Sequence, residues 1–131
     1  MDATSRQLVR ERAGNLCEYC RLPQGSYDLT FHVEHIVAQQ HQLDDTLFNL
    51  ALACDQCNLH KGTNLVTIEQ QSGQQVRLCN PRSDAWDEHF CLVGARIVGR
   101  TAIGRGTARL LQMNSERRLR LRKQLLSIGE L

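Results

Sequence analysis

The stretch FHVEHIVAQQHQLDDTLFNLALACDQCNLHKG, from Phe31 to Gly62, decides how the rest of the chain is organised. It contains an acid–histidine pair, Glu34 and His35, and two asparagines, Asn49 and Asn58. It also carries a Cys-x-x-Cys motif near its end. The pattern indicates two metal sites of different character. Cysteine thiolates suit a soft structural ion, whereas a carboxylate and an amide oxygen beside a histidine suit a hard one.

Two Cys-x-x-Cys pairs, which lie far apart in the chain, predict a single zinc site. The four residues are Cys17, Cys20, Cys54 and Cys57. Two cysteines three positions apart on a tight turn present both sulfurs to one point, which suits tetrahedral zinc. One such pair alone is also typical of a redox motif, and chance pairs of buried thiols are the other alternative. The presence of two pairs favours one four-cysteine site.

Length and composition are those of one ordinary domain. The 131 residues are 23% charged and 41% hydrophobic, which predicts a single domain, residues 1–131, with a modest core. No run of about 18 apolar residues occurs, so we expect no membrane-spanning helix and no membrane partner. The N-terminal residues lack the apolar stretch of a secretory signal, so a cytoplasmic location is expected, where cysteines are metal ligands or buried thiols.

Positive charge is concentrated in the C-terminal part, although the net charge is only +2. Residues 96–131 contain nine Arg or Lys and two Asp or Glu, whereas residues 1–95 contain seven and twelve. A basic segment of this kind indicates a polyanionic partner. A solvated helix surface has the same composition, and charge alone leaves both interpretations open.

Local patterns predict which elements carry the motifs. Phe31–Ala38 is rich in β-formers and is interpreted as a strand. On a regular strand Glu34 and His35 point to opposite faces, so both can serve one centre only if the strand bends or ends there. Residues 46–53 are compatible with a short helix or an extended run. The second cysteine pair then opens a helical turn that carries Asn58.

A helix is also expected before the first cysteine pair. Thr4 or Ser5 can cap it, and it runs to about Ala13 with Leu8 and Val9 facing inward.

Taken together, these pieces resemble the HNH endonuclease family, which has the ββα-metal (His-Me finger) fold. The matching pieces are VEHI, FNLALAC and CDQCNLHKG, with CEYC upstream, and they span about residues 10–62. Each piece alone is weak, but their combined spacing is highly specific. The resemblance implies an α+β fold, in which a ββα-metal finger is stapled by a four-cysteine zinc site. Residues 63–131 would then add accessory β-hairpins and C-terminal helices.

The resemblance also implies roles for single residues. His35 occupies the position of the general base, and Asn49 that of the asparagine that braces the loop between strand and helix. Glu34, which is more often aspartate in the family, and Asn58 occupy the positions of the ligands to the catalytic ion. Gly62 stands where some relatives, such as nuclease colicins, have a further histidine. This difference favours Mg²⁺ or Mn²⁺ over a histidine-rich transition-metal centre.

The chemistry of these residues is coherent with phosphodiester hydrolysis. Histidine titrates near neutrality, so His35 can take a proton from water. Magnesium held by Glu34 and Asn58 keeps open positions for water and for a phosphate oxygen. The predicted function is therefore metal-dependent endonucleolytic cleavage of DNA, duplex or nicked. The alternatives are a non-catalytic, zinc-stabilised nucleic-acid-binding module and an interaction protein whose basic helix binds another protein.

Structural, non-catalytic roles are the alternative for some of these residues, and the other histidines and cysteines are assigned as follows. The acid–histidine pair could be a surface pair on an edge strand, and Asn58 a polar helix residue. His32 is interpreted as structural, with an accessory ligand or base as the alternative. We expect His41 and His60 to face solvent or substrate, His89 to pack among aromatic side chains, and Cys79 and Cys91 to act as small buried hydrophobes.

The second half predicts two hairpins followed by two helices. Turn signals at QQSGQ and around Gly94 separate four strand-like runs, residues 65–69, 75–79, 90–93 and 96–98. One helix is expected to start near Gly106 and to end before Asn114. Ser115 caps the last helix, in which Leu121, Leu125 and Ile128 share a face.

Cations near and beyond the motif are predicted to hold DNA. Lys61 follows Asn58 by three positions, so both lie on one face of a helix. Arginine can fork onto phosphate oxygens and suits the task better than lysine. The predicted contacts are Lys61, Arg105, Arg109, Arg118 and Arg122.

Overall fold

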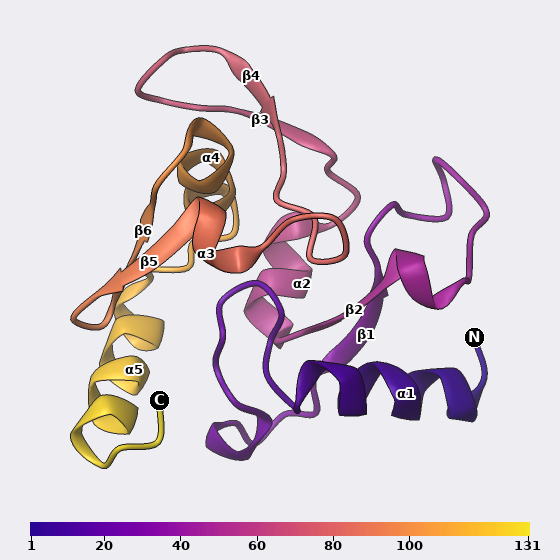
Figure 1. Ribbon diagram of the computed structural model, residues 1–131, viewed down its shortest axis with the longest axis horizontal. Coiled ribbons are helices and arrows are strands. Elements are labelled where there is room, and N and C mark those ends of the chain that lie inside the picture. The colour runs from indigo at the N-terminus through magenta and orange to yellow at the C-terminus, as the bar shows by residue number, and fades with distance from the viewer.

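Three two-stranded antiparallel hairpins and five α-helices make up the fold in a computed structural model, which describes residues 1–131 (Figure 1). No helix is both long enough and apolar enough to cross a membrane. In chain order the elements are α1 (Ala3–Ala13), the 3-10 helix η1 (Gln24–Ser26), β1 (His32–His35), the 3-10 helix η2 (Leu47–Asn49), β2 (Leu50–Ala53), α2 (Asp55–Lys61), β3 (Val66–Ile68), β4 (Gln75–Arg77), α3 (Trp86–His89), β5 (Phe90–Val93), β6 (Arg96–Gly99), α4 (Ala102–Leu110) and α5 (Glu116–Ser127).

Helix α1 begins earlier than its sequence predicts. Asp2 is the N-cap, and its carboxylate accepts a hydrogen bond from the backbone N–H of Ser5 at 2.8 Å. The prediction of a cap at Thr4 or Ser5 was therefore wrong, because the aspartate three residues before Ser5 satisfies the free N–H first. Val9 is buried as predicted, but Leu8 is 45% exposed. Neighbouring positions on a helix point in different directions, so only one of the two faces the core.

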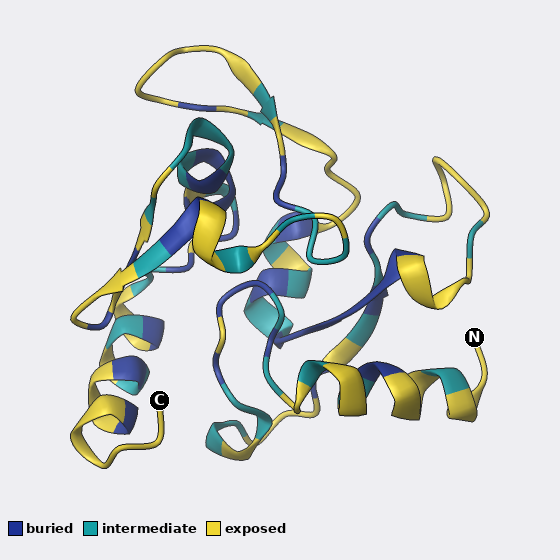
Figure 2. Ribbon diagram, in the orientation of Figure 1, coloured by how far each residue is buried: buried dark blue, intermediate teal, exposed yellow.

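A ββα unit, formed by β1, β2 and α2, lies at the centre of the molecule. Strand β1 pairs antiparallel with β2, with Glu34 opposite Ala51 and His35 opposite Leu50. Strand β1 ends at His35 rather than at residue 38, and the helical and extended alternatives for residues 46–53 both occur, as η2 followed by β2. All of β2 is buried in the main core (Figure 2).

The side chain of Asn49 explains why β1 stops where it does. Its carboxamide accepts a hydrogen bond from Val37 N at 2.9 Å and donates to Val37 O at 3.1 Å and to Asp44 O at 2.9 Å. These three bonds take the place of strand pairing and close the loop between β1 and β2. The bracing position that the family resemblance implies for Asn49 is thus occupied by a buried loop-closing residue.

The second half forms the predicted hairpins β3–β4 and β5–β6, followed by α4 and α5. Helix α4 starts at Ala102, before the predicted Gly106, because Thr101 caps it through a hydrogen bond from Gly104 N at 3.0 Å. Gly104 is required inside this helix, since a Cβ there would lie 2.0 Å from the carbonyl oxygen of His89. The α+β class predicted from the sequence is confirmed, with a ββα unit beside a cluster of four cysteines.

Candidate functional site

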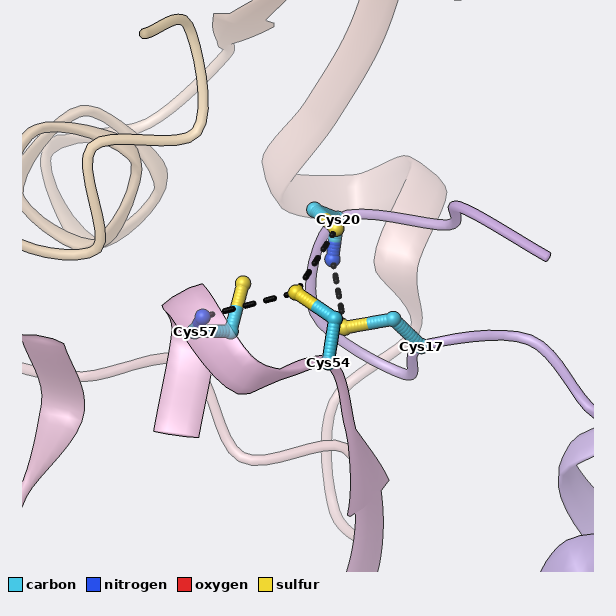
Figure 3. Close-up of side chains that lie close together, drawn as sticks. All are labelled: Cys17, Cys20, Cys54 and Cys57. Atoms are coloured by element: carbon cyan, nitrogen blue, oxygen red, sulfur yellow. Dashed lines mark hydrogen bonds between the residues drawn. The ribbon is translucent and has the colours of Figure 1, made fainter. Parts of the chain in front are cut away.

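The four cysteines meet at one point between the turn after α1 and the start of α2 (Figure 3). Their sulfur atoms all lie within 4.8 Å of one another, and the sulfurs of Cys20 and Cys54 are 3.7 Å apart. A tetrahedral zinc ion with bonds of ~2.3 Å would separate its sulfurs by about 3.8 Å. All four residues are 0% exposed. The cluster fits a structural zinc ion, as the two Cys-x-x-Cys pairs predict.

The shifted pKa values of the four buried thiols also favour a bound cation in the cluster. Burial raises the pKa of the Cys17 and Cys57 thiols well above the ordinary value. Hydrogen bonds with Cys17 lower the pKa of the Cys20 and Cys54 thiols. Four buried sulfurs cannot all carry negative charge without a compensating ion, and zinc binds thiolates with release of their protons.

Arg118 lies directly against this cluster. Its Nη1 donates to the sulfur of Cys57 at 3.1 Å, and its Nη2 donates to the carbonyl oxygens of Leu111 and Gln112. Burial alone would lower the pKa of Arg118, but the cysteine sulfurs raise it above the ordinary value. Helix α5, which carries Arg118, therefore contributes a permanent positive charge to the zinc site of the ββα unit.

Two predicted DNA contacts are wrong as a result. Arg118 and Arg122 are both 0% exposed, so neither guanidinium can reach a phosphate. Arg122 donates through Nη1 to Ala95 O at 2.9 Å and through Nη2 to Met113 O. The pair lies one turn apart as expected, but on the inner face of α5, where backbone carbonyls of two connections accept hydrogen bonds from both guanidinium groups.

A second site is an open pocket at the end of β1. It brings together the three residues predicted to carry catalysis: Glu34 and His35 from β1 and Asn58 from α2. The remaining lining residues are His32, Val33, Ala38, Gln39 and Gly62. The end of β1 at His35 supplies the bend that the sequence argument requires for Glu34 and His35 to serve one centre.

Glu34 is held by two protein donors inside this pocket. The residue is 8% exposed, and its Oε1 accepts a hydrogen bond from the Tyr19 hydroxyl. Its Oε2 accepts from Lys61 Nζ at 3.0 Å. Burial raises the pKa of Glu34, while the Lys61 charge and both hydrogen bonds oppose that rise.

Lys61 is therefore not the DNA contact that the sequence predicts. It is 2% exposed, and besides Glu34 its ammonium group donates to His35 O at 3.3 Å and Ile36 O at 2.9 Å. Three acceptors use all three N–H groups. The helix-face argument placed Lys61 near Asn58 correctly, but that face packs against the end of β1 rather than facing solvent.

His35 has an acidic neighbour that sequence reasoning missed. Its Nε2 lies 2.6 Å from Oδ1 of Asp45, in the loop between β1 and η2. This hydrogen bond lowers the pKa of Asp45. The only sequence signal was the Asp44–Asp45 pair within the polar loop, which is also typical of solvated turns.

Asn58 is half-buried, and its carboxamide has no hydrogen-bond partner within the protein. The free amide oxygen is the kind of ligand that a hard ion prefers.

The remaining predicted residues lie outside both sites. Arg105 and Arg109 do not line the pocket. Arg105 is partly exposed and donates to Glu69 at 3.2 Å, and Arg109 is exposed. Cys79 is buried, as predicted, whereas Cys91 is only half-buried. His89 is also buried, and its ring nitrogens lie 2.6 Å from the Thr101 hydroxyl and 3.6 Å from Asp84 Oδ1.

Comparison with known proteins identifies the central part of the chain. The family model described as HNH endonuclease matches residues 17–64. No curated protein and no solved structure matches the chain. The matched stretch runs from the first zinc-site cysteine to just beyond α2 and so includes all four cysteines and the pocket residues. Residues 17–64 are therefore similar to the HNH endonuclease family, and they include four clustered cysteines that could hold a metal ion.

Proposed function

We propose that the protein is an endonuclease that hydrolyses phosphodiester bonds in DNA with the help of a divalent ion, Mg²⁺ or Mn²⁺. One observation carries the proposal: Glu34, His35 and Asn58 line one open pocket within the part of the chain that matches the HNH family. An open pocket beside a closed cysteine cluster is the arrangement that catalysis requires, since substrate must enter the one and not the other.

His35 is the proposed general base. With a proton on Nε2, the imidazole donates to the Asp45 carboxylate at 2.6 Å, and Nδ1 keeps its lone pair. That nitrogen then accepts a proton from the attacking water. Asp45 fixes the tautomer and stabilises the imidazolium that forms. Asn49 acts from a distance, because it closes the loop that carries Asp45.

Glu34 and Asn58 are the proposed ligands of the divalent ion. Each oxygen of Glu34 already accepts one hydrogen bond, but a carboxylate offers about four lone-pair positions, so one remains on each oxygen. Asn58 adds an amide oxygen. Such a donor set fits a hard ion that keeps several waters. When bound, the ion supplies charge neutralisation at the phosphate and at the leaving oxygen.

A non-catalytic nucleic-acid-binding module is the second candidate, and one observation favours it. Lys61 already places a positive charge 3.0 Å from the Glu34 carboxylate. A permanent ammonium group can replace a metal ion as the partner of a buried acid. In that case the pocket would retain the family's residues without binding an ion.

Nicking of supercoiled plasmid by zinc-loaded protein distinguishes the two candidates. We expect open circles only when Mg²⁺ or Mn²⁺ is added. Omission of the divalent ion is the better control, because EDTA would also strip the cysteine site. Asn58→Ala should need more Mg²⁺ for the same rate, with zinc content unchanged, while His60→Ala on the same helix should behave as wild type. DNA binding without nicking under every ion tested would favour the binding module.

A further inference from the structure

A groove with three arginines lies between β6 and α4, outside the stretch that matches the HNH family. Arg96, Arg105 and Arg109 line it, and no acidic side chain does. The other lining residues are Ile97, Gly99, Ala108, Gln112, Asn114 and Ser115. We call this feature the arginine groove.

The walls of the arginine groove are fixed by close contacts. A Cβ at Gly99 would lie 2.3 Å from the backbone nitrogen of Arg105, so glycine allows β6 and α4 to touch. The carboxamide of Asn114 accepts from Ile97 N at 2.8 Å and donates to Ile97 O at 2.7 Å, which attaches the end of the groove to β6. Rigid walls hold the cations in place before any ligand arrives.

The arginine groove contains cationic groups that lack partners within the protein. Arg96 and Arg109 are exposed, and neither has a hydrogen-bond or ion-pair partner. Arg105 uses one nitrogen for Glu69, and its buried Nε has no partner. Elsewhere in this basic segment, Arg117 lies over Tyr27 and Arg120 pairs with Glu116. Of the exposed cations in this segment without a partner, two, Arg96 and Arg109, thus lie together in the groove, and Lys123 lies outside it.

We propose that the arginine groove binds the sugar–phosphate backbone of duplex DNA. Guanidinium groups fork onto phosphate oxygens, and Gln112 and Ser115 add neutral donors. No aromatic side chain lines the groove, so it has nothing on which an unpaired base could stack. It therefore recognises backbone rather than sequence. The choice of DNA as the polyanion rests on the proposed function.

Salt-dependent binding tests the groove separately from catalysis. Zinc-loaded His35→Ala protein is titrated into a fluorescent duplex of arbitrary sequence, without added divalent ion, at 50–200 mM salt. Arg96→Gln/Arg109→Gln in that background should bind at least about tenfold more weakly, and the log–log salt slope should fall by about 1.8, at ~0.9 per phosphate contact. A second, unrelated duplex should show the same loss.

The control variant is Arg6→Gln/Lys123→Gln, which removes the same charge from two exposed, unpaired residues outside the groove. It should leave the slope nearly unchanged. Equal losses of DNA affinity in both double variants would mean that net charge alone explains the effect. An unchanged salt slope in the groove variant would contradict DNA binding by the groove. Preferential binding of duplex RNA, or no nucleic-acid binding at all, would contradict the proposal that duplex DNA is the ligand of the groove. Binding with an intact groove effect but no plasmid nicking would contradict the proposed nuclease and leave the groove standing.

Discussion

The cysteine cluster and the pocket at the end of β1 use neighbouring residues of one helix for opposite purposes. Cys57 is 0% exposed and belongs to the cluster, whereas the next residue, Asn58, presents a free amide to the open pocket. Successive side chains on a helix point about 100° apart, so α2 can face both sites at once. The closed cysteine cluster therefore fixes the position of the helix that carries Asn58 into the open pocket. Loss of the cluster should therefore disable the pocket, while changes in the pocket should spare the cluster.

The largest expected effect comes from breaking the closed site. Cys54→Ser removes a zinc ligand that is also the N-cap of α2. Apparent zinc-binding free energies are about 10–16 kcal/mol in small zinc domains, so we expect loss of the metal and of the folded ββα unit, and with it any nicking. Elemental analysis and a thermal melt measure both. Cys91→Ser, outside the cluster, is the control. A folded Cys54→Ser protein with one zinc ion would contradict the role of the cluster.

Breaking the open site should have a smaller and purely chemical effect. His35→Ala should slow plasmid nicking by about 10²–10⁴-fold, because the proposed general base is lost. Zinc content and melting temperature should stay at wild-type values, since Asp45 is the only hydrogen-bond partner of the His35 side chain and the backbone contacts of His35 are kept. His60→Ala is the matched control. A nicking rate equal to wild type would exclude His35 as the base, and a large fall in melting temperature would show that the two sites are not separable in this direction.

Arg118 sharpens the comparison, because it links the closed site to α5. Arg118→Leu removes the guanidinium donor from the Leu111 carbonyl and from one cysteine sulfur, and it leaves Gln112 O with only the backbone N–H of Ser115. A buried group left unsatisfied costs about 1–3 kcal/mol, so a stability loss of about 2–4 kcal/mol and faster zinc transfer to a chelator are expected.

Two further variants separate charge from geometry at this position. Arg118→Lys should retain zinc better than Arg118→Leu, because lysine keeps the positive charge but lacks the two-nitrogen donor geometry of the guanidinium group. Arg120→Leu, which removes an exposed ion pair, should change little. Wild-type zinc release from Arg118→Leu would mean that α5 and the cluster are energetically independent.

The sequence predicts both sites where the signal is local. Cysteine pairs on tight turns, and the spacing of His35, Asn49 and Asn58, require no knowledge of distant contacts. The predicted limits of about 10–62 also agree closely with the family match at 17–64. Asn49 and the end of β1 are determined by hydrogen bonds across one loop, so a short stretch of chain contains all of the information.

Burial of charge could not be predicted in the same way, because it depends on partners far along the chain. Lys61 donates to Glu34, which lies 27 positions earlier in the chain, and Arg118 donates to Cys57, which lies 61 positions earlier. One signal was nevertheless present. The buried face of α5 is Arg118, Arg122 and Leu125, at i, i+4 and i+7. The prediction used Leu121, Leu125 and Ile128 instead, and Ile128 is 68% exposed.

The smallest expected effect concerns the half of the molecule that has no metal cluster. There, Asp84 connects β4 to the segment before α3: it accepts from Arg77 Nη1 and Nη2 at 2.7 and 2.9 Å and from Asn80 N at 2.8 Å. The hydrogen bonds from Arg77 are the main reason why the pKa of Asp84 falls from 3.8 to about 2. A carboxylate with a lowered folded pKa contributes stability that is fully present above its unfolded pKa and disappears as pH falls through the folded value.

Asp84→Asn should therefore lower the urea midpoint by the same amount at pH 7 and at pH 5, because the wild-type carboxylate is ionised in both folded and unfolded chains at those values. The deficit should shrink only below about pH 4, where the unfolded chain begins to take up the proton. Asp87→Asn, which alters an exposed carboxylate without a side-chain hydrogen bond, serves as the control. Urea unfolding followed by Trp86 fluorescence measures the difference. A deficit that already changes between pH 7 and pH 5 would place the titrating group elsewhere, with the buried His89 as the first alternative, because its Nε2 lies 3.6 Å from Asp84 Oδ1.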